Sequence, residues 1–161
     1  PPPPPPPPSP PPPPPHTNTM VSSSAASDVY KRQAELIKAQ GIQKIALLGT
    51  RFTMEENFYK GRLIEKYGLE VIIPGSEDME IIHRIIYDEL CAGVIQPDSK
   101  QQYADIIQRL AKEGAEGIIL GCTEIGLLVK QEDSPVPLFD TTEIHARAAV
   151  KYALADEMSL P

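Results

Sequence analysis

The chain has 161 residues, a formal net charge of −7 and a calculated pI near 5.0. This acidic balance argues against nucleic acid and anionic membrane surfaces as partners, because clustered Lys and Arg side chains drive binding to phosphates. No apolar run approaches the ~20 residues that a membrane-spanning helix needs, and the N-terminus lacks the features of a secretory signal. We therefore expect a cytoplasmic protein whose two cysteines, Cys91 and Cys122, stay reduced.

The first 33 residues differ in composition from the rest of the chain. Fourteen of the 19 prolines lie within residues 1–15, and residues 16–33 are polar, small and aperiodic, so they offer no apolar face to bury. Residues 22–33 also resemble a translated sequencing adaptor. We expect residues 1–33 to be a disordered segment and residues 34–161 to form one domain. An alternative interpretation of the proline tract is a polyproline II arm that binds SH3 or WW modules.

Predicted strands and helices alternate along residues 34–161. Short apolar runs predict strands over residues 44–49, 70–74, 117–120 and 136–140. Apolar residues at helical spacing predict the helices between and after them. The first begins after Gly49, the second is capped by Ser76, the third starts at Asp98 or Ser99, and the last is capped by Thr141 or Thr142. Such alternation predicts an α/β fold with an open, mostly parallel sheet and flanking helices.

Cys122 stands where the predicted strand over residues 117–120 ends, within the segment Gly-Cys-Thr-Glu. The carboxyl ends of parallel strands are where open α/β sheets bind ligands. The N-terminus of the next helix would favour thiolate over thiol and would offer free N–H groups to a carboxylate. The alternative is a small buried cysteine without chemistry, since free cysteine is among the most buried residue types.

Two further strand ends are rich in small and polar residues, Gly49-Thr50-Arg51 and Asp140-Thr141-Thr142. In a parallel sheet these ends share one edge with Cys122, so their hydroxyls and helix N–H groups would surround a small anionic ligand. Ordinary helix capping explains the threonines, including Thr53, equally well. Arg51 is either a solvated surface cation or a bidentate clamp for a carboxylate.

Four segments have a distinctive residue order: residues 44–63 (KIALLGTRFTMEENFYKGRL), Tyr87-Asp-Glu-Leu-Cys91, Gly121-Cys-Thr-Glu-Ile-Gly-Leu-Leu-Val129 and Pro137-Leu-Phe-Asp-Thr141. Together they resemble the aspartate/glutamate racemase family, and in particular its broad-specificity amino-acid racemase branch. The resemblance extends over residues 34–154, and Gly-Cys-Thr-Glu is its most specific signature.

The resemblance implies an amino-acid racemase that uses neither pyridoxal phosphate nor any other cofactor or metal. In such a reaction two acid/base groups flank the Cα atom; one removes its proton and the other returns a proton on the opposite face. By the resemblance Cys122 is one of these groups. Thr123 would hold the substrate's carboxylate or amino group, and Glu124 would orient its neighbours or adjust the proton affinity of the thiol. Thr50 and Arg51 would be further substrate contacts, and the intact protein would be a homodimer.

The chain departs from this family in one respect. Family members consist of duplicated α/β halves with a second catalytic cysteine in the N-terminal half, in a Cys-Asn-Thr context that this sequence lacks. The resemblance therefore implies the C-terminal half of a pseudo-symmetric two-domain racemase, with little or no turnover alone. Cys91 is not expected to replace the missing group, because near a helix C-terminus it would be a buried thiol with a disfavoured thiolate.

Two other functions remain open from the residues. One is an amidase or thiol hydrolase in which Cys122 is the nucleophile and His145 the base, which requires the pair to lie within hydrogen-bond reach. The other is a non-catalytic module that binds small carboxylates, or a fragment without activity. A burst of product from a substrate-like ester would separate the hydrolase from proton transfer. Changing Cys122 to alanine separates the module from the racemase, because it would abolish hydrogen exchange at Cα but leave the ligand affinity of a module nearly intact.

Overall fold

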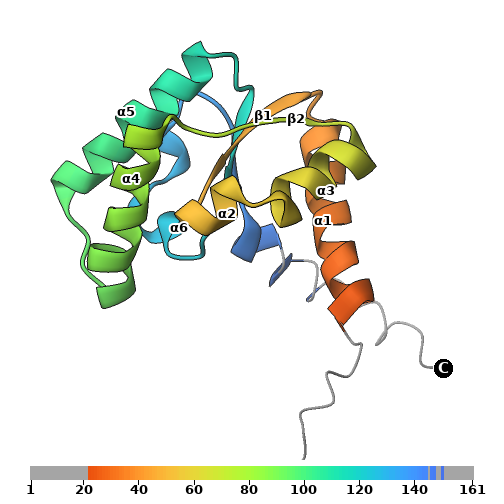
Figure 1. Cartoon of the computed structure of the whole chain (residues 1–161), viewed down its shortest axis with the longest axis horizontal. Helices are drawn as coiled ribbons and strands as arrows, with labels where there is room; N and C mark the ends of the chain where they lie inside the picture. The colour runs from red at the N-terminus through yellow and green to blue at the C-terminus, as the bar shows by residue number, and fades with distance from the viewer. Residues whose placement is uncertain (1–21, 145, 148–149, 151–161) are drawn as a thin grey trace, which may run out of the picture.

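The computed structural model describes residues 22–144, 146–147 and 150 (Figure 1). Its sheet has four parallel strands in the order β2-β1-β3-β4. Their bounds are β1 Lys44–Leu48, β2 Glu70–Ile72, β3 Gly117–Leu120 and β4 Leu138–Asp140. The predicted α/β fold, with an open parallel sheet and flanking helices, is therefore confirmed. The proline tract lies outside the described residues.

Helices cover both faces of the sheet (Figure 1). Helices α4 (Ser76–Arg84) and α5 (Pro97–Lys112) pack on one face, and α1 (Ser22–Ala39) and α3 (Asn57–Tyr67) pack on the other. None of the helices within the described ranges is long and apolar enough to cross a membrane.

Shorter helical elements lie at the ends of the strands and between the longer helices. The bounds are α2 Arg51–Glu55 after β1, a π-helical turn η1 Ile85–Glu89 and a 3₁₀ turn η2 Leu90–Ala92 between α4 and α5, α6 Ile125–Leu128 after β3, and a 3₁₀ turn η3 Gln131–Asp133 before β4. Figure 1 shows α2 and α6 at the same end of the sheet.

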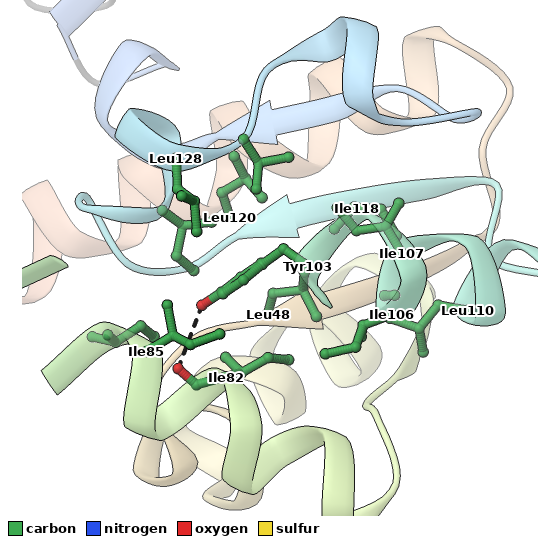
Figure 2. Close-up of a cluster of buried hydrophobic side chains, with 14 of the residues drawn as sticks. Leu48, Ile82, Ile85, Tyr103, Ile106, Ile107, Leu110, Ile118, Leu120 and Leu128 are labelled. Carbon is green, nitrogen blue, oxygen red and sulfur yellow. Dashed lines mark hydrogen bonds between the residues drawn. The ribbon is translucent and has the colours of Figure 1, made fainter. Parts of the chain in front are cut away.

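Buried residues of β1 alternate between the two faces of the sheet, as the period of a strand requires. Ile45 and Leu47 pack with residues of α1 and α3, whereas Ala46 and Leu48 pack with residues of α4 and α5. Figure 2 shows the second cluster around Tyr103, whose buried hydroxyl donates to a backbone carbonyl of α4 at 3.5 Å. Because both faces are covered, the strands read as continuous apolar runs in the sequence.

Helix α1 begins before residue 34, where the sequence analysis places the start of the domain. The Tyr30 ring packs edge-on against the Tyr59 ring at a centroid distance of 5.1 Å, and buried Gln33 accepts a hydrogen bond from the Tyr59 hydroxyl at 2.8 Å. Tyr30, Gln33 and buried Ile37 follow helical spacing on one face. The sequence does not predict this face, because residues 16–33 are polar and aperiodic and a glutamine occupies one of its buried positions.

Three helix boundaries differ in detail from the prediction. Helix α4 is preceded by Gly75 as its N-cap, so Ser76 is its first residue, and α5 begins at Pro97. Proline suits the first helical position, because its missing N–H has no partner there in any case. The predicted helix after β1 breaks at Glu56, whose extended backbone separates α2 from α3.

Candidate active site

Three strand ends meet at one edge of the sheet. The strand register aligns Leu48 with Leu120, and Leu120 with Asp140. The residues that follow these positions therefore lie together at the carboxyl end of the sheet, as the sequence predicts. Thr141 adds a direct link, because its hydroxyl donates to the Leu120 carbonyl oxygen at 3.0 Å.

Asp140 caps the helical residues 141–144 that follow β4. Its Oδ1 accepts hydrogen bonds from the backbone N–H groups of Thr142 at 2.8 Å and Glu143 at 3.3 Å. The predicted cap, Thr141 or Thr142, is therefore wrong, since the carboxylate one position earlier satisfies the free N–H groups. The other carboxylate oxygen lies against Gly126 of α6, where a side chain would collide with it.

Gly121 fixes the position of Cys122 against the end of β1. The backbone N–H of Gly121 donates to the Leu48 carbonyl oxygen at 2.7 Å. A Cβ atom at position 121 would lie 2.9 Å from that oxygen and 3.0 Å from a methyl carbon of Leu47. Any side chain would therefore push the end of β3 away from β1.

The Cys122 thiol is half-buried and donates a hydrogen bond to Glu124, with 2.8 Å between Sγ and Oε2. Burial raises the pKa of Cys122, and the hydrogen bond to the Glu124 carboxylate adds to this effect, bringing the pKa to about 12. The pKa of Glu124 is lowered, because its carboxylate accepts hydrogen bonds from Cys122 and from the Thr123 hydroxyl. At neutral pH the pair is a neutral thiol beside an ionised carboxylate.

This protonation state corrects the expectation of a favoured thiolate. Helix α6 begins only at Ile125 and has four residues, so its dipole is short and its first turn lies beyond Cys122. Burial and the Glu124 carboxylate are the main causes of the raised pKa of Cys122. In the structure Cys122 is a proton donor.

Thr50 is the N-cap of α2. Its Oγ1 accepts a hydrogen bond from the backbone N–H of Thr53 at 3.3 Å and lies 3.0 Å from the Thr53 hydroxyl. When the Thr53 hydroxyl donates in this pair, the Thr50 hydroxyl keeps its own proton for a ligand. Thr50 can therefore cap the helix and contact a substrate at the same time.

Both the side chain and the backbone of Arg51 have partners. Its exposed guanidinium forms an ion pair with Glu80 of α4 and lies 3.9 Å from the Glu55 carboxylate. Its backbone N–H donates to Nδ1 of His83 at 3.3 Å. A carboxylate clamp by Arg51 would therefore require its guanidinium to exchange protein partners for a ligand. Sequence reasoning assigns no role to His83, although its spacing from Glu80 would have placed the two on one face of α4.

Cys91 is exposed, so the expectation of a buried thiol is wrong. It follows Leu90 in η2, and Leu90 takes the buried position. Turn η2 packs beside α6, and a charge on Cys91 would contribute to raising the pKa of Cys122. The other residue considered for catalysis, His145, lies outside the described residues.

The groups at this edge are hydroxyls, a thiol, carboxylates and one guanidinium. In the described part of the chain, no three or more His, Cys, Asp or Glu side chains are grouped to hold a metal ion. Hydroxyl and carboxylate groups suit hydrogen bonding to the carboxylate and ammonium groups of an amino acid, and a thiol suits proton transfer.

The family model for Asp/Glu/hydantoin racemases matches residues 28–149. The chain belongs to the Asp/Glu/hydantoin racemase family. The matched residues include all three strand ends and Cys122, and they begin within α1. The match therefore includes residues 28–33, which precede the predicted start of the domain at residue 34.

Solved structures of racemase relatives share the fold. A candidate Asp/Glu racemase from Yersinia pestis is 56% identical, with a TM-score of 0.75, over 78% of this chain and 55% of its own. An aspartate racemase homologue from Pyrococcus horikoshii OT3 is 41% identical, with a TM-score of 0.70, over 78% of this chain and 54% of its own. The Picrophilus torridus aspartate racemase, 23% identical with a TM-score of 0.60, has the same fold over 78% of this chain and 51% of its own.

One curated relative is a Pectobacterium carotovorum subsp. carotovorum protein described only as uncharacterized, in the 3′ region of pnlA. It is 28% identical over 120 residues, which are 73% of this chain and 78% of the relative. The chain spans about half the length of the solved racemase structures that it matches.

Proposed function

We propose that this chain forms one half of the active site of a cofactor-independent amino-acid racemase, with Cys122 as one of two acid/base groups. The observation that carries the proposal is the position of the Cys122 thiol at the carboxyl end of the sheet, where its Sγ lies 2.8 Å from Oε2 of Glu124. Family membership and the racemase relatives support the reaction class.

The chemistry of the thiol suits racemisation, which removes the Cα proton from one face and returns a proton on the other. The protonated Cys122 thiol carries the proton that a planar carbanion would take up on its face. In the reverse direction Cys122 must act as a thiolate, although burial and Glu124 raise its pKa. The ammonium group of an amino acid placed beside Glu124 would offset this effect, because a positive charge favours the thiolate.

The neighbouring residues would hold the two ends of the amino acid. In this proposal Glu124 and the Thr123 hydroxyl bind the ammonium end, and the Thr50 hydroxyl binds the carboxylate. Arg51 would contact the substrate carboxylate only after its guanidinium has left Glu80. We propose that the second acid/base group lies in sequence outside this chain, because the solved racemase structures are almost twice as long as the part matched here.

Hydrogen exchange at Cα tests this function. The chain is incubated with aspartate in D₂O, and loss of the Cα–H signal is followed by ¹H NMR. We expect slow exchange. While the pH is below the pKa of Cys122, the exchange rate should rise about tenfold with each unit of increasing pH, because the thiolate fraction rises by that factor. Exchange should vanish in Cys122→Ala and persist in the matched control Cys91→Ser.

Two outcomes would decide against a racemase. Equal exchange in wild type and Cys122→Ala would show that the thiol takes no part in proton transfer. Aspartate binding of equal affinity in both proteins, without exchange in either, would favour the non-catalytic carboxylate-binding module.

A further inference from the structure

His83 of α4 contacts the first residue of α2, which directly follows the N-cap residue Thr50. Its Nδ1 accepts a hydrogen bond from the backbone N–H of Arg51 at 3.3 Å. Arg51 is the first residue of α2, and the first N–H groups of a helix have no acceptor within the helix itself. The His83 imidazole on α4 therefore accepts the hydrogen bond from an Arg51 N–H group that has no acceptor within α2.

The surrounding residues hold the imidazole in place. The His83 and Tyr87 rings are in contact, with centroids 4.6 Å apart, and Glu80 on the same face of α4 pairs with the Arg51 guanidinium. Arg51 is thus bound to α4 through its backbone and its side chain. These two contacts hold the turn that carries Thr50 against α4.

We propose that His83 is a positioning residue, which fixes the Thr50–Arg51 corner through the acceptor at Nδ1 and so sets the orientation of the Thr50 hydroxyl. Its importance for a substrate rests on the proposed racemase function, whereas its effect on the corner does not. Because Nδ1 accepts, the imidazole is neutral and carries its proton on Nε2.

Several other charged or titratable groups face this contact or lie on adjoining turns. They are Arg51 and Glu55 of α2, Glu80 and Arg84 of α4, and Tyr87 of η1. The contribution of the His83 contact can therefore be isolated only with a variant that keeps the hydrogen-bond acceptor. His83→Asn is that variant, since its amide oxygen can stand near the position of Nδ1.

Amide hydrogen exchange of the whole chain, followed by NMR, tests the proposal. At about pH 8 the Arg51 amide should be protected in wild type, and its protection factor should fall about fivefold or more in His83→Ala. The Ile119 amide in β3 serves as an internal reference for global unfolding. His83→Asn should restore most of the protection at Arg51.

Either of two results would overturn the proposal. One is equal protection of Arg51 in wild type and His83→Ala; the other is His83→Asn behaving like His83→Ala. Titration of the same proteins with aspartate then examines the substrate role separately. Weaker binding in His83→Ala, with recovery in His83→Asn, is expected. If aspartate binds to none of the three proteins, that result contradicts the racemase function. The proposal for His83 is then decided by the amide exchange at Arg51 alone.

Discussion

The Cys122 thiol keeps its proton because two features oppose the thiolate: burial, and the carboxylate oxygen of Glu124 at 2.8 Å. The sequence predicts where this thiol lies, since an apolar run followed by Gly121 locates the strand end. It does not predict the protonation state, because the depth of burial and the direction of the Glu124 side chain depend on packing between distant segments. The same limit applies to Cys91, whose exposure follows from a turn and not from its neighbours in sequence.

The effect of Glu124 on the thiol can be measured directly. Glu124→Gln should lower the pKa of Cys122, because it replaces a negative acceptor by a neutral amide, while burial still keeps the pKa above its ordinary value. A decrease of one unit would speed alkylation of Cys122 by iodoacetamide at about pH 8 roughly tenfold, since only the thiolate reacts. The measurement uses Cys91→Ser throughout, with exposed Glu132→Gln as the control. An unchanged rate in Glu124→Gln would show that its carboxylate does not govern the thiol.

The two cysteines should differ sharply in reactivity. Cys91 is exposed, whereas Cys122 is half-buried with a pKa raised to about 12. One equivalent of iodoacetamide at about pH 8 should therefore modify Cys91 and leave Cys122 as a free thiol. Peptide mapping by mass spectrometry locates the label. Preferential labelling of Cys122 would contradict the structure at this site.

At the scale of elements, the segment from α4 through η1 to η2 shows what periodicity can and cannot predict. Met79, Ile82, Ile86 and Leu90 are buried, as their helical spacing predicts. The spacing does not reveal that one turn is π-helical and the next is 3₁₀, because four-residue steps fit a wider turn as well. The change of turn ends the helix at Leu90 and leaves Cys91 on the surface.

Changing two glycines to alanine should have opposite effects on the free energy of unfolding, because only Gly121 lies at the close contact of β1 and β3. Gly121→Ala should destabilise the protein by about 1–3 kcal/mol, since its Cβ would lie 2.9 Å from the Leu48 carbonyl oxygen. Gly61→Ala should stabilise it by up to about 1 kcal/mol, because Gly61 lies inside α3, where the nearest atom to its Cβ is an ordinary 3.6 Å away. Urea unfolding measures both free energies. Equal effects of the two changes would contradict the close strand contact.

At the scale of the whole molecule, the sequence predicts the parallel sheet and the common edge of its strand ends, because both follow from alternating apolar runs. It does not predict that α1 begins before residue 34, because the packing of Tyr30 and Gln33 against Tyr59 joins segments distant in sequence. The fold can thus be predicted from the local sequence pattern, whereas the helix that begins before residue 34 packs through a tertiary contact that this pattern does not contain. The chain still spans only about half the length of the solved racemase structures.

Buried phenols predict a loss of stability at alkaline pH. Burial raises the pKa values of Tyr59 and Tyr103, so the folded protein keeps these protons while the unfolded chain begins to lose them near pH 10. The raised pKa of Cys122 acts in the same direction from a lower pH, because an unfolded thiol ionises near about pH 8.5. The free energy of unfolding should therefore be constant below about pH 8 and fall as pH rises, and the two phenols should steepen this fall near about pH 10. Urea unfolding at about pH 8 and about pH 10.5 measures the decrease, which Tyr103→Phe should reduce. A decrease of equal size in Tyr103→Phe would exclude a contribution from this phenol.

The proposal that Cys122 serves a single face of Cα is tested most directly by exchange resolved by enantiomer. D-Aspartate and L-aspartate are incubated separately with the chain in D₂O, and chiral chromatography with mass spectrometry gives the deuterium content and configuration of each. We expect deuterium to enter one enantiomer faster, with its configuration retained, and only while Cys122 is present. Inversion of configuration as fast as deuterium uptake, or equal uptake by both enantiomers in Cys122→Ala, would contradict a one-sided site built on this thiol.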